Sequence, residues 1–397
     1  MLFYFNFVVL CVYHRCKNTI ISYNKKSVKR NSVNICSIKV FLVLLQVARM
    51  RKLVDILRSE HHLENSEYKV LLECDDKSVV AYLHGQAREV GDEVFGKGIF
   101  VRGLVELTNV CRNDCLYCGI RKSNTAVERY LLTSEQVLQS CQQGYELGFR
   151  TFVLQGGELP RDKAPWLVEL VGEIRQRWSD CAITLSLGEW PKEVYAALRK
   201  AGANRYLLRH ESHNAEHYER LHPVEMSLSN RLQCLVWLKE LGYQVGTGIM
   251  VGSPWQSLDN IVEDIEFIEQ FEPEMIGLGP FVPQHDTPLG KYATGSADIT
   301  CRLYSIFRLM FPKALIPSTT ALNTIIPNGR TMGIMAGANV VMPNLSPTSV
   351  RGNYALYDGK AITNAEAAEG VSQLKTQLAT IGYHINWGRG DHYLSVK

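Results

Sequence analysis

Residues 100–118 read Phe-Val-Arg-Gly-Leu-Val-Glu-Leu-Thr-Asn-Val-Cys-Arg-Asn-Asp-Cys-Leu-Tyr-Cys. The stretch begins with an apolar and β-branched run over residues 100–107, which is typical of a buried strand. It continues into Thr-Asn-Val-Cys, at the place where a dinucleotide-binding fold has a glycine-rich phosphate loop. The stretch therefore predicts the first strand of a buried parallel sheet and disfavours a dinucleotide-binding fold.

The strand-then-helix pattern recurs eight times from residue 100 onward, with amphipathic segments between the apolar runs. The predicted strands are residues 100–107, 151–154, 182–187, 205–208, 245–251, 275–278, 314–318 and 339–342. The clearest predicted helices are residues 134–147, 191–200, 227–241 and 258–270. Four helices end at a glycine that leads straight into the next strand, namely Gly148, Gly202, Gly242 and Gly337. Eight such units match a closed (β/α)8 TIM-type barrel, an α/β fold, better than an open doubly wound sheet.

Three segments are predicted along the chain. Residues 100–390 form the barrel with a C-terminal extension after the last strand, and residues 50–99 form a helical N-terminal cap. Residues 1–49 are a basic extension outside the core, interpreted either as sequence upstream of a native start at Met50 or as a targeting segment. A cytoplasmic location is expected, with an organelle matrix as the alternative if residues 1–49 are a transit segment.

Charge is distributed unevenly along the chain. Eight of the 43 Lys and Arg residues and none of the 40 Asp and Glu residues lie in residues 1–49, so the rest carries a net charge of −5. This acidic body lacks the clustered basic face of a nucleic-acid-binding protein, which excludes that class of partner. The apolar runs at residues 1–13 and 40–47 are shorter than the roughly 20 residues that cross a bilayer, so no membrane span is expected. Eleven scattered cysteines indicate a reducing compartment.

Polar residues follow the carboxyl ends of the predicted strands. In a barrel the active site is built at this end, from the loops that follow each strand. The polar stretches there are 108–111, 155–158, 188–190, 209–211, 252–254, 284–286, 319–320 and Asn344. We therefore expect the function to reside at this mouth of the barrel.

The most specific motif is the cysteine trio Cys111, Cys115 and Cys118, directly after the first predicted strand. Three closely spaced thiolates are soft ligands suited to an iron–sulfur cluster or to zinc. A structural zinc site normally has four protein ligands, and no fourth Cys or His lies within ten residues of the trio. Three thiolates on a four-iron cluster leave one iron free to bind another molecule. Three incidental buried cysteines are the plain alternative.

The motif C-x3-C-x-aromatic-C after the first strand, with Tyr117 as the aromatic residue, resembles the radical S-adenosylmethionine (SAM) superfamily. Gly156-Gly157-Glu158 at the end of the second strand resembles the motif with which that superfamily binds the SAM amino group. The resemblance implies a 4Fe-4S cluster on Cys111, Cys115 and Cys118. It also implies that electron transfer to SAM releases methionine and a 5′-deoxyadenosyl radical.

Within the superfamily, several motifs in order resemble the HydE family of FeFe-hydrogenase maturases, over residues 51 to 390. They are Thr184–Pro191, Arg205–Glu211, Met250-Val-Gly, Gly279–Pro283, Pro317–Ala321 and Val341–Asn344. The resemblance implies an enzyme of H-cluster assembly whose radical acts on a cavity-bound iron–cysteine synthon on the way to the diiron subcluster. It also implies other hydrogenase maturases as partners and an electron donor such as ferredoxin or flavodoxin.

The resemblance to HydE assigns residues by position. Ser186, Glu211 and Arg231 match contacts to the amino-acid end of SAM, for which Arg suits the carboxylate and Glu the ammonium. A further set matches the lining of the substrate cavity, namely Arg209, Thr319, Thr320, Met342, Tyr354 and Tyr357. Arg205 lies four residues before Arg209 on one predicted strand, so both side chains are expected to face inward, and Arg205 is predicted to line the substrate cavity too.

One cluster is expected. Many HydE proteins carry a second cysteine trio near the C-terminus, but the last cysteine here is Cys301. Biotin synthase, a related barrel with a second cluster inside, is disfavoured because Cys141 and Cys234 fall within predicted helices and Cys181 precedes its strand. Methylornithine synthase, which lacks a second cluster, is the harder rival, and the motifs around Glu189 and Arg209 favour HydE over it. A non-catalytic iron–sulfur scaffold or carrier is the alternative of another class.

Overall fold

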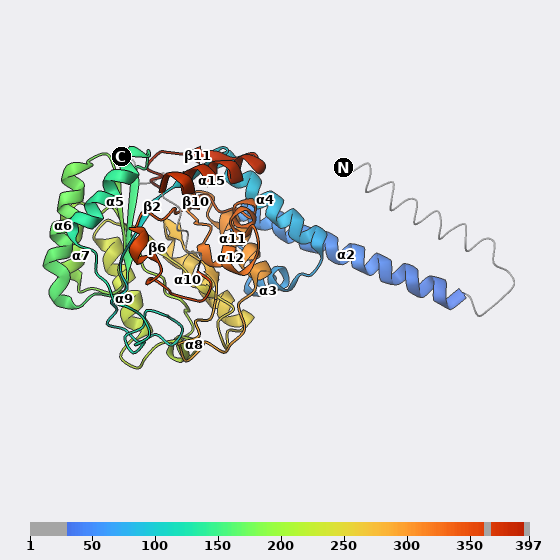
Figure 1. The fold of residues 1–397 in the computed structure, drawn as a ribbon. Coiled ribbons are helices and arrows are strands. Elements are labelled where there is room, and N and C mark those ends of the chain that lie inside the picture. Colours follow the sequence, from blue (N-terminus) through green and yellow to red (C-terminus); the bar gives the residue numbers. More distant parts are fainter. Residues whose placement is uncertain (1–29, 361–366, 393–397) are drawn as a thin grey trace. The chain divides into compact units, whose positions relative to one another are not determined.

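The computed structural model describes residues 30–360 and 367–392, with side chains from residue 40 onward (Figure 1). The chain divides into two compact units, Met1–Leu53 and Val54–Lys397, and helix α2 (Arg30–Glu60) contains the boundary. Among the described residues, no helix combines the length and the apolar character needed to cross a membrane. The site described below lies entirely within the second unit.

The second unit is built on parallel strands. Six of them pair in sequence order: β2 (Gly103–Thr108), β3 (Thr151–Gly156), β4 (Ala182–Ser186), β5 (Arg205–Leu207), β6 (Gln244–Thr247) and β8 (Met275–Ile276). Parallel bridges then join Met275 to Leu315, and Pro317 to Val340 of β10 (Val340–Val341). Another parallel bridge joins Leu104 of β2 to Asn344, so the last segment pairs with the first strand and the barrel is closed. The predicted α/β barrel is confirmed.

Shorter strands complete the sheet. At one end of the barrel β1 (Gly98–Val101) lies between β10 and β11 (His384–Asn386), and at the other β7 (Met250–Val251) pairs with β9 (Gly279–Pro280). The predicted strand 245–251 is therefore two strands, β6 and β7. Gly248 separates them with φ +157°, and a Cβ at this position would lie 1.8 Å from the Gly277 carbonyl oxygen. The predicted strand 100–107 is likewise divided, at Arg102, and residues 314–318 form single bridges.

The helices of this unit cover the outside of the strands (Figure 1). They are α3 (Asn65–Glu73), α4 (Lys77–Phe95), α5 (Ser134–Glu146), α6 (Ala164–Arg177), α7 (Lys192–Ala201), α8 (Ala215–Leu221), α9 (Leu228–Glu240), α10 (Leu258–Phe271), α11 (Ala297–Met310), α12 (Thr320–Ile325), α13 (Gly329–Met335), α14 (Thr348–Arg351) and α15 (Ala367–Thr380). The four clearest predicted helices, now α5, α7, α9 and α10, agree to within one residue at each end. Gly148, Gly202, Gly242 and Gly337 all have positive φ, as helix-ending glycines require.

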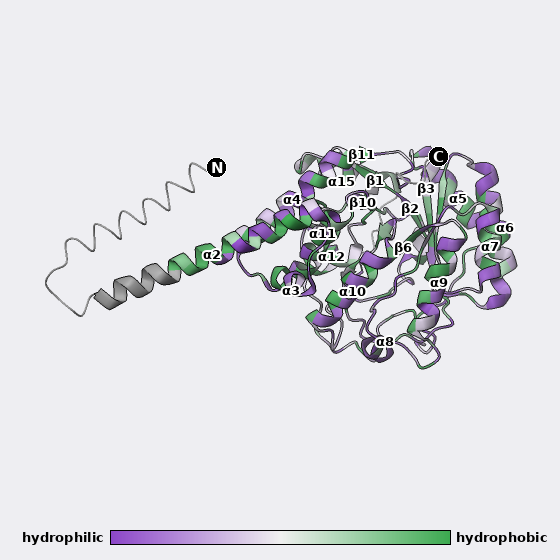
Figure 2. Ribbon diagram, turned by 180° about the vertical axis from the view of Figure 1, so that it is seen from behind, coloured by the Kyte–Doolittle hydropathy of each residue, from purple (hydrophilic) through white to green (hydrophobic). Residues whose placement is uncertain are grey.

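Burial follows the layers of the barrel. All six residues of β2 are buried, and Figure 2 shows β2 and β3 in the hydrophobic colour while α6 and α7 alternate between the two colours. Parallel strands that are covered by helices lose contact with water on both faces, which explains their continuous apolar runs. The polar side chains Glu106 and Gln155 interrupt these runs near the carboxyl ends of β2 and β3. The strands therefore change from a packed interior to a polar mouth along their length.

Candidate active site

A cavity of about 430 Å³ lies at the carboxyl ends of the strands. Sixteen of the seventeen predicted site residues line it, and the exception is Arg205. The lining residues among them are Cys111, Cys115, Tyr117, Cys118, Gly156, Gly157, Glu158, Ser186, Arg209, Glu211, Arg231, Thr319, Thr320, Met342, Tyr354 and Tyr357. The cysteines and the expected SAM contacts thus share one chamber with the expected substrate contacts.

The cysteine loop is held in place by neighbouring segments. The Leu116 amide donates to the Leu221 carbonyl at 2.9 Å, and the Leu289 amide donates to the Leu116 carbonyl at 3.2 Å. Asp114, between the first two cysteines, accepts from the Arg121 guanidinium at 2.6 Å and from the Ser123 hydroxyl at 2.7 Å. The loop is therefore fixed by both main-chain and side-chain bonds, and its three thiols face one cavity.

The electrostatics of the three thiols suit a shared cationic partner. Burial raises the pKa of Cys118 to about 12, with a further contribution from the negative charge of Cys111. Burial also raises the pKa of Cys115 well above its usual value, and Cys118 and Cys111 add to the shift. Metal ligation deprotonates such thiols because the metal charge offsets both burial and mutual repulsion. Three thiolates in one loop fit an iron–sulfur cluster, whereas a structural zinc site normally takes four protein ligands.

Gly157 allows the second strand's loop to approach the cysteine loop. A Cβ at this position would lie 2.4 Å from the Val110 carbonyl oxygen and 2.8 Å from Cys111 Cβ. Both distances are below van der Waals contact, so any larger residue would displace the loop. The glycine is thus required by the packing of one motif on the other.

We expect Gly157→Ala to lower the iron content of anaerobically reconstituted protein by more than half, because the added methyl displaces Cys111. Gly172→Ala is the matched control, since Gly172 lies in α6 with nothing within 4 Å of the point that a methyl group would occupy, and alanine favours a helix by about 1 kcal/mol. Iron per chain and the cluster's visible absorbance are the measurements. Equal iron content in both variants would contradict the packing argument.

Acidic and basic side chains alternate beside the glycines. Arg231 Nε donates to Glu189 Oε1 at 2.6 Å, and Arg231 Nη2 lies 3.8 Å from Glu158 Oε1. Glu158 Oε2 lies 2.9 Å from Arg112 Nη2. Burial raises the pKa of Glu158, and the positive charge of Arg231 opposes that shift. The arrangement provides carboxylates for an ammonium and a guanidinium for a carboxylate, which are the two groups of an amino-acid end.

Arg209 and Glu211 face the cavity from the segment after β5. Arg209 Nε donates to Glu211 Oε1 at 3.0 Å, and 30% of the Arg209 side chain is exposed, toward the cavity. The other carboxylate oxygen, Glu211 Oε2, is buried with no hydrogen-bond donor among the described residues. A buried carboxylate oxygen without a donor is costly, so this atom fits an incoming ammonium group such as that of SAM.

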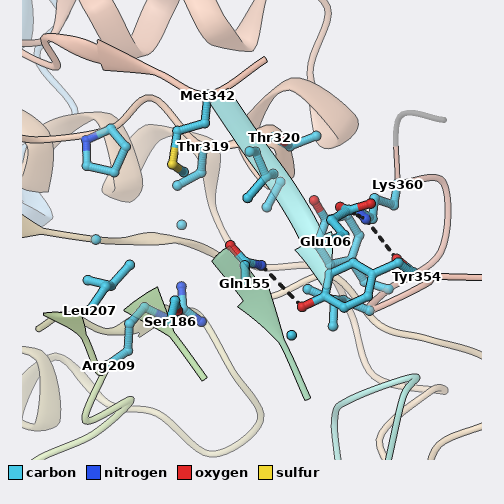
Figure 3. A pocket seen from close by; sticks show the side chains of 18 of the residues that line it. Glu106, Gln155, Ser186, Leu207, Arg209, Thr319, Thr320, Met342, Tyr354 and Lys360 are labelled. Carbon is cyan, nitrogen blue, oxygen red and sulfur yellow. Dashed lines mark hydrogen bonds and ion pairs between the residues drawn. The ribbon is translucent and has the colours of Figure 1, made fainter. Parts of the chain in front are cut away.

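Sequence reasoning missed a charged pair on the opposite wall. Glu106 of β2 is 1% exposed, accepts from Asn344 Nδ2 at 2.9 Å and is paired with the ammonium of Lys360 (Figure 3). Lys360 Nζ also donates to the Tyr354 carbonyl at 2.8 Å, and Gln155 Nε2 donates to the Tyr354 hydroxyl at 3.4 Å. The position of Glu106 within an apolar predicted strand was a signal in the sequence that could have identified it as a site residue. Its partner, 254 residues away, was not predictable from spacing.

The prediction for Arg205 is wrong. Its guanidinium is buried at the opposite end of the barrel, where Nη2 pairs with Asp391 Oδ1 at 2.6 Å and Nη1 donates to the Thr151 hydroxyl at 3.2 Å. Arg205 is the first residue of β5 and pairs in register with Gln244, the first residue of β6. The side chain is internal, but it lies at the amino ends of the strands and stabilises the floor of the barrel.

Residues 105–268 match the Radical SAM superfamily. The chain is 41% identical over 292 residues to the [FeFe] hydrogenase maturase subunit HydE of Thermotoga maritima, covering 74% of this chain and 83% of that protein. This chain belongs to the HydE family. Membership makes it a radical SAM enzyme, and the superfamily implies a 4Fe-4S cluster and SAM as cofactors.

The HydE family is favoured over its neighbours by degree of similarity. The 3-methylornithine synthase of Methanosarcina barkeri is 29% identical, over 75% of this chain and 84% of that protein. A crystal structure of methylornithine synthase (PylB) superposes with a TM-score of 0.73 at 26% identity, covering 84% of this chain and 97% of that one. The biotin synthase of Geobacillus kaustophilus is 22% identical, over 77% of this chain and 87% of that protein. The match to the HydE protein is therefore the strongest of these three in sequence identity.

Proposed function

We propose that this HydE-family enzyme acts in the assembly of the H-cluster of FeFe hydrogenase. Its substrate would be an iron–cysteine synthon bound in the cavity, processed toward the diiron subcluster. The observation that supports the proposal is that one chamber is lined by the cysteine trio, by Ser186, Glu211 and Arg231, and by Arg209 and two tyrosines. The 41% identity to a protein named as a hydrogenase maturase subunit supports it.

The chain's own residues divide the work within this chamber. Cys111, Cys115 and Cys118 would hold one 4Fe-4S cluster, and no second cluster is proposed. Ser186, Glu211 and Arg231, with Gly156 and Gly157, would bind the amino-acid end of SAM. When bound, the cluster supplies the electron that splits SAM into methionine and a 5′-deoxyadenosyl radical.

Beyond the cofactor end, the walls would position the synthon and exclude water. Arg209 provides a guanidinium that fits an anionic iron–cyanide–carbonyl species, because it lines the cavity and 30% of its side chain is exposed. Tyr354, Tyr357 and Met342 also line the chamber, and Thr319 and Thr320 add hydroxyls. Exclusion of water would protect a reactive radical from side reactions with solvent.

The proposal includes partners that act before and after this step. An electron donor such as ferredoxin or flavodoxin would reduce the cluster, and other hydrogenase maturases would deliver the synthon and receive the product. Location in the cytoplasm, or in an organelle matrix, stays a prediction, as do the domain boundaries at residues 50 and 100. Residues 1–29 lie outside the described part of the chain.

The deciding experiment is a maturation assay with defined partners. Dithionite-reduced, reconstituted protein is expected to form 5′-deoxyadenosine from SAM, and active hydrogenase is expected to appear when the iron–cysteine synthon is supplied. Both products are measured with and without the synthon. SAM cleavage without any gain in hydrogenase would contradict the maturase assignment, and the absence of 5′-deoxyadenosine would favour a non-catalytic iron–sulfur carrier.

A further inference from the structure

His210 lies between the two site residues Arg209 and Glu211. Its side chain is fully buried and does not line the cavity. Its Nδ1 lies 2.8 Å from the Thr247 hydroxyl of β6, and its Nε2 lies 3.2 Å from Asp264 Oδ1 of α10. The ring also meets Phe267 of α10 edge to face, at 4.7 Å between centroids. Arg209 and His210 are neighbours on the segment after β5, so anchoring His210 outward directs Arg209 inward, and Glu211 follows His210 at a turn with φ +66°.

Asp264 connects this anchor to the next turn of chain. The same oxygen, Asp264 Oδ1, accepts from the His213 amide at 2.5 Å, and both the Asp264 and His210 side chains are 0% exposed. Burial raises the pKa of Asp264 and lowers the pKa of His210 to about 3, which favours an uncharged imidazole. The network then assigns the Nε2–H tautomer, with Nε2 donating to Asp264 and Nδ1 accepting from Thr247.

The segment that this anchor holds is strained. Glu211 has φ +66°, in the left-handed region that a glutamate rarely adopts. Its amide donates to the Gly248 carbonyl at 3.1 Å, and Arg231 Nη1 donates to the Arg209 carbonyl at 3.0 Å. These bonds fix the main chain at one side of the turn, and the His210–Asp264–Thr247 contacts fix it at the other.

We propose that His210, held by Asp264 and Thr247, is a positioning residue that keeps Glu211 and Arg209 aimed into the cavity for the amino-acid end of SAM. The inference rests on the proposed role of Glu211 in binding SAM. Asp264 and Thr247 lie outside the cavity lining. The inference gives them a function in cofactor binding, because they hold His210 in place. Substitutions behind the site should therefore change the affinity for SAM without removing any group that would touch it.

The test compares Asp264→Leu with Asp264→Asn. Leucine removes the acceptor for both His210 and the His213 amide, whereas asparagine retains a carbonyl oxygen at the same place. We expect Asp264→Leu to raise the dissociation constant of the reconstituted protein for SAM about tenfold, because it removes the acceptor of two hydrogen bonds that hold the turn carrying Arg209 and Glu211. Asp264→Asn should stay within about twofold of the wild type. Hydrogen exchange of the peptide that spans residues 205–214 should be faster in Asp264→Leu, measured on the protein as isolated.

Thr247→Val provides a second and milder variant if Asp264→Leu does not fold. It removes only the hydroxyl that donates to His210 Nδ1, and it should also weaken SAM binding and speed exchange at residues 205–214. Folded variants that bind SAM as the wild type does, or an Asp264→Asn variant as weak as Asp264→Leu, would overturn the inference. A wild-type protein that forms no 5′-deoxyadenosine would instead overturn the proposed function, while the exchange and binding measurements would still decide the role of His210.

Discussion

Replacing Cys115 with alanine is expected to abolish 5′-deoxyadenosine formation, to below about 1% of the wild-type rate, and with it hydrogenase maturation. Cys115 is the middle residue of the trio, and its thiol faces the same cavity as Cys111 and Cys118. A cluster with two cysteine ligands has a second open iron and is readily lost. The measurements are iron per chain, SAM cleavage under dithionite and hydrogenase activity after incubation with defined maturases.

Cys234→Ala is the matched control for that experiment. Cys234 is a buried thiol in α9 outside the cavity lining, so its loss removes a small apolar group without touching the site. The control should retain its iron and its SAM cleavage, at a modest cost in stability. Maturation that persists in Cys115→Ala would contradict the proposed function.

Lys360→Met is expected to destabilise the protein by about 3–5 kcal/mol, because it leaves the buried carboxylate of Glu106 without its cation. The free energy of unfolding of the cluster-free protein, from urea denaturation, measures this effect. The change also removes the bond from Lys360 to the Tyr354 carbonyl, so the cavity wall that Tyr354 forms should lose order.

The double variant Glu106→Gln with Lys360→Met separates the ion pair from the rest of the wall. Glutamine keeps an oxygen acceptor for Asn344 Nδ2 and carries no charge, so most of the lost stability should return. If both variants unfold at the same urea concentration, the penalty does not come from the unpaired carboxylate.

The cysteine trio and the Gly156-Gly157-Glu158 motif were predictable because each lies at the carboxyl end of a barrel strand or in the loop that follows it, within ten residues of that end. In such loops, position in the sequence nearly determines position at the mouth. The barrel itself followed from the repeated strand–helix pattern and from the glycines that end its helices. Spacing within single loops therefore located the half of the site expected to bind the cofactor.

Arg205 shows where the same reasoning failed. Alternation along the segment that begins with β5 correctly placed both Arg205 and Arg209 inside the barrel, but four residues of extended chain cover about 13 Å. One side chain therefore belongs to the floor and the other to the mouth. The sequence pattern predicted which face of the strand each side chain occupies. The position of each side chain along the barrel axis required the register of β5 on β6.

The contacts that sequence spacing could not supply are those between distant segments. Lys360 reaches Glu106 from the C-terminal part of the chain, and Asp264 reaches His210 from α10. The positive φ of Glu211 also depends on tertiary bonds, since a glutamate gains nothing from it locally. These contacts determine how the site residues are held in place, and they form only in the folded barrel.

The floor of the barrel has a consequence for the order in which the protein is made. Arg205 is neutralised by Asp391, which the ribosome adds 186 residues later, and β1 takes its two neighbours, β10 and β11, from the last part of the described chain. Until residues 384–391 have been made, the nascent barrel therefore lacks the carboxylate partner of Arg205 and one neighbour of β1. Closing such long loops is slow, and exposed edges invite aggregation. Synthesis of this enzyme should depend on chaperones that shield the half-built barrel.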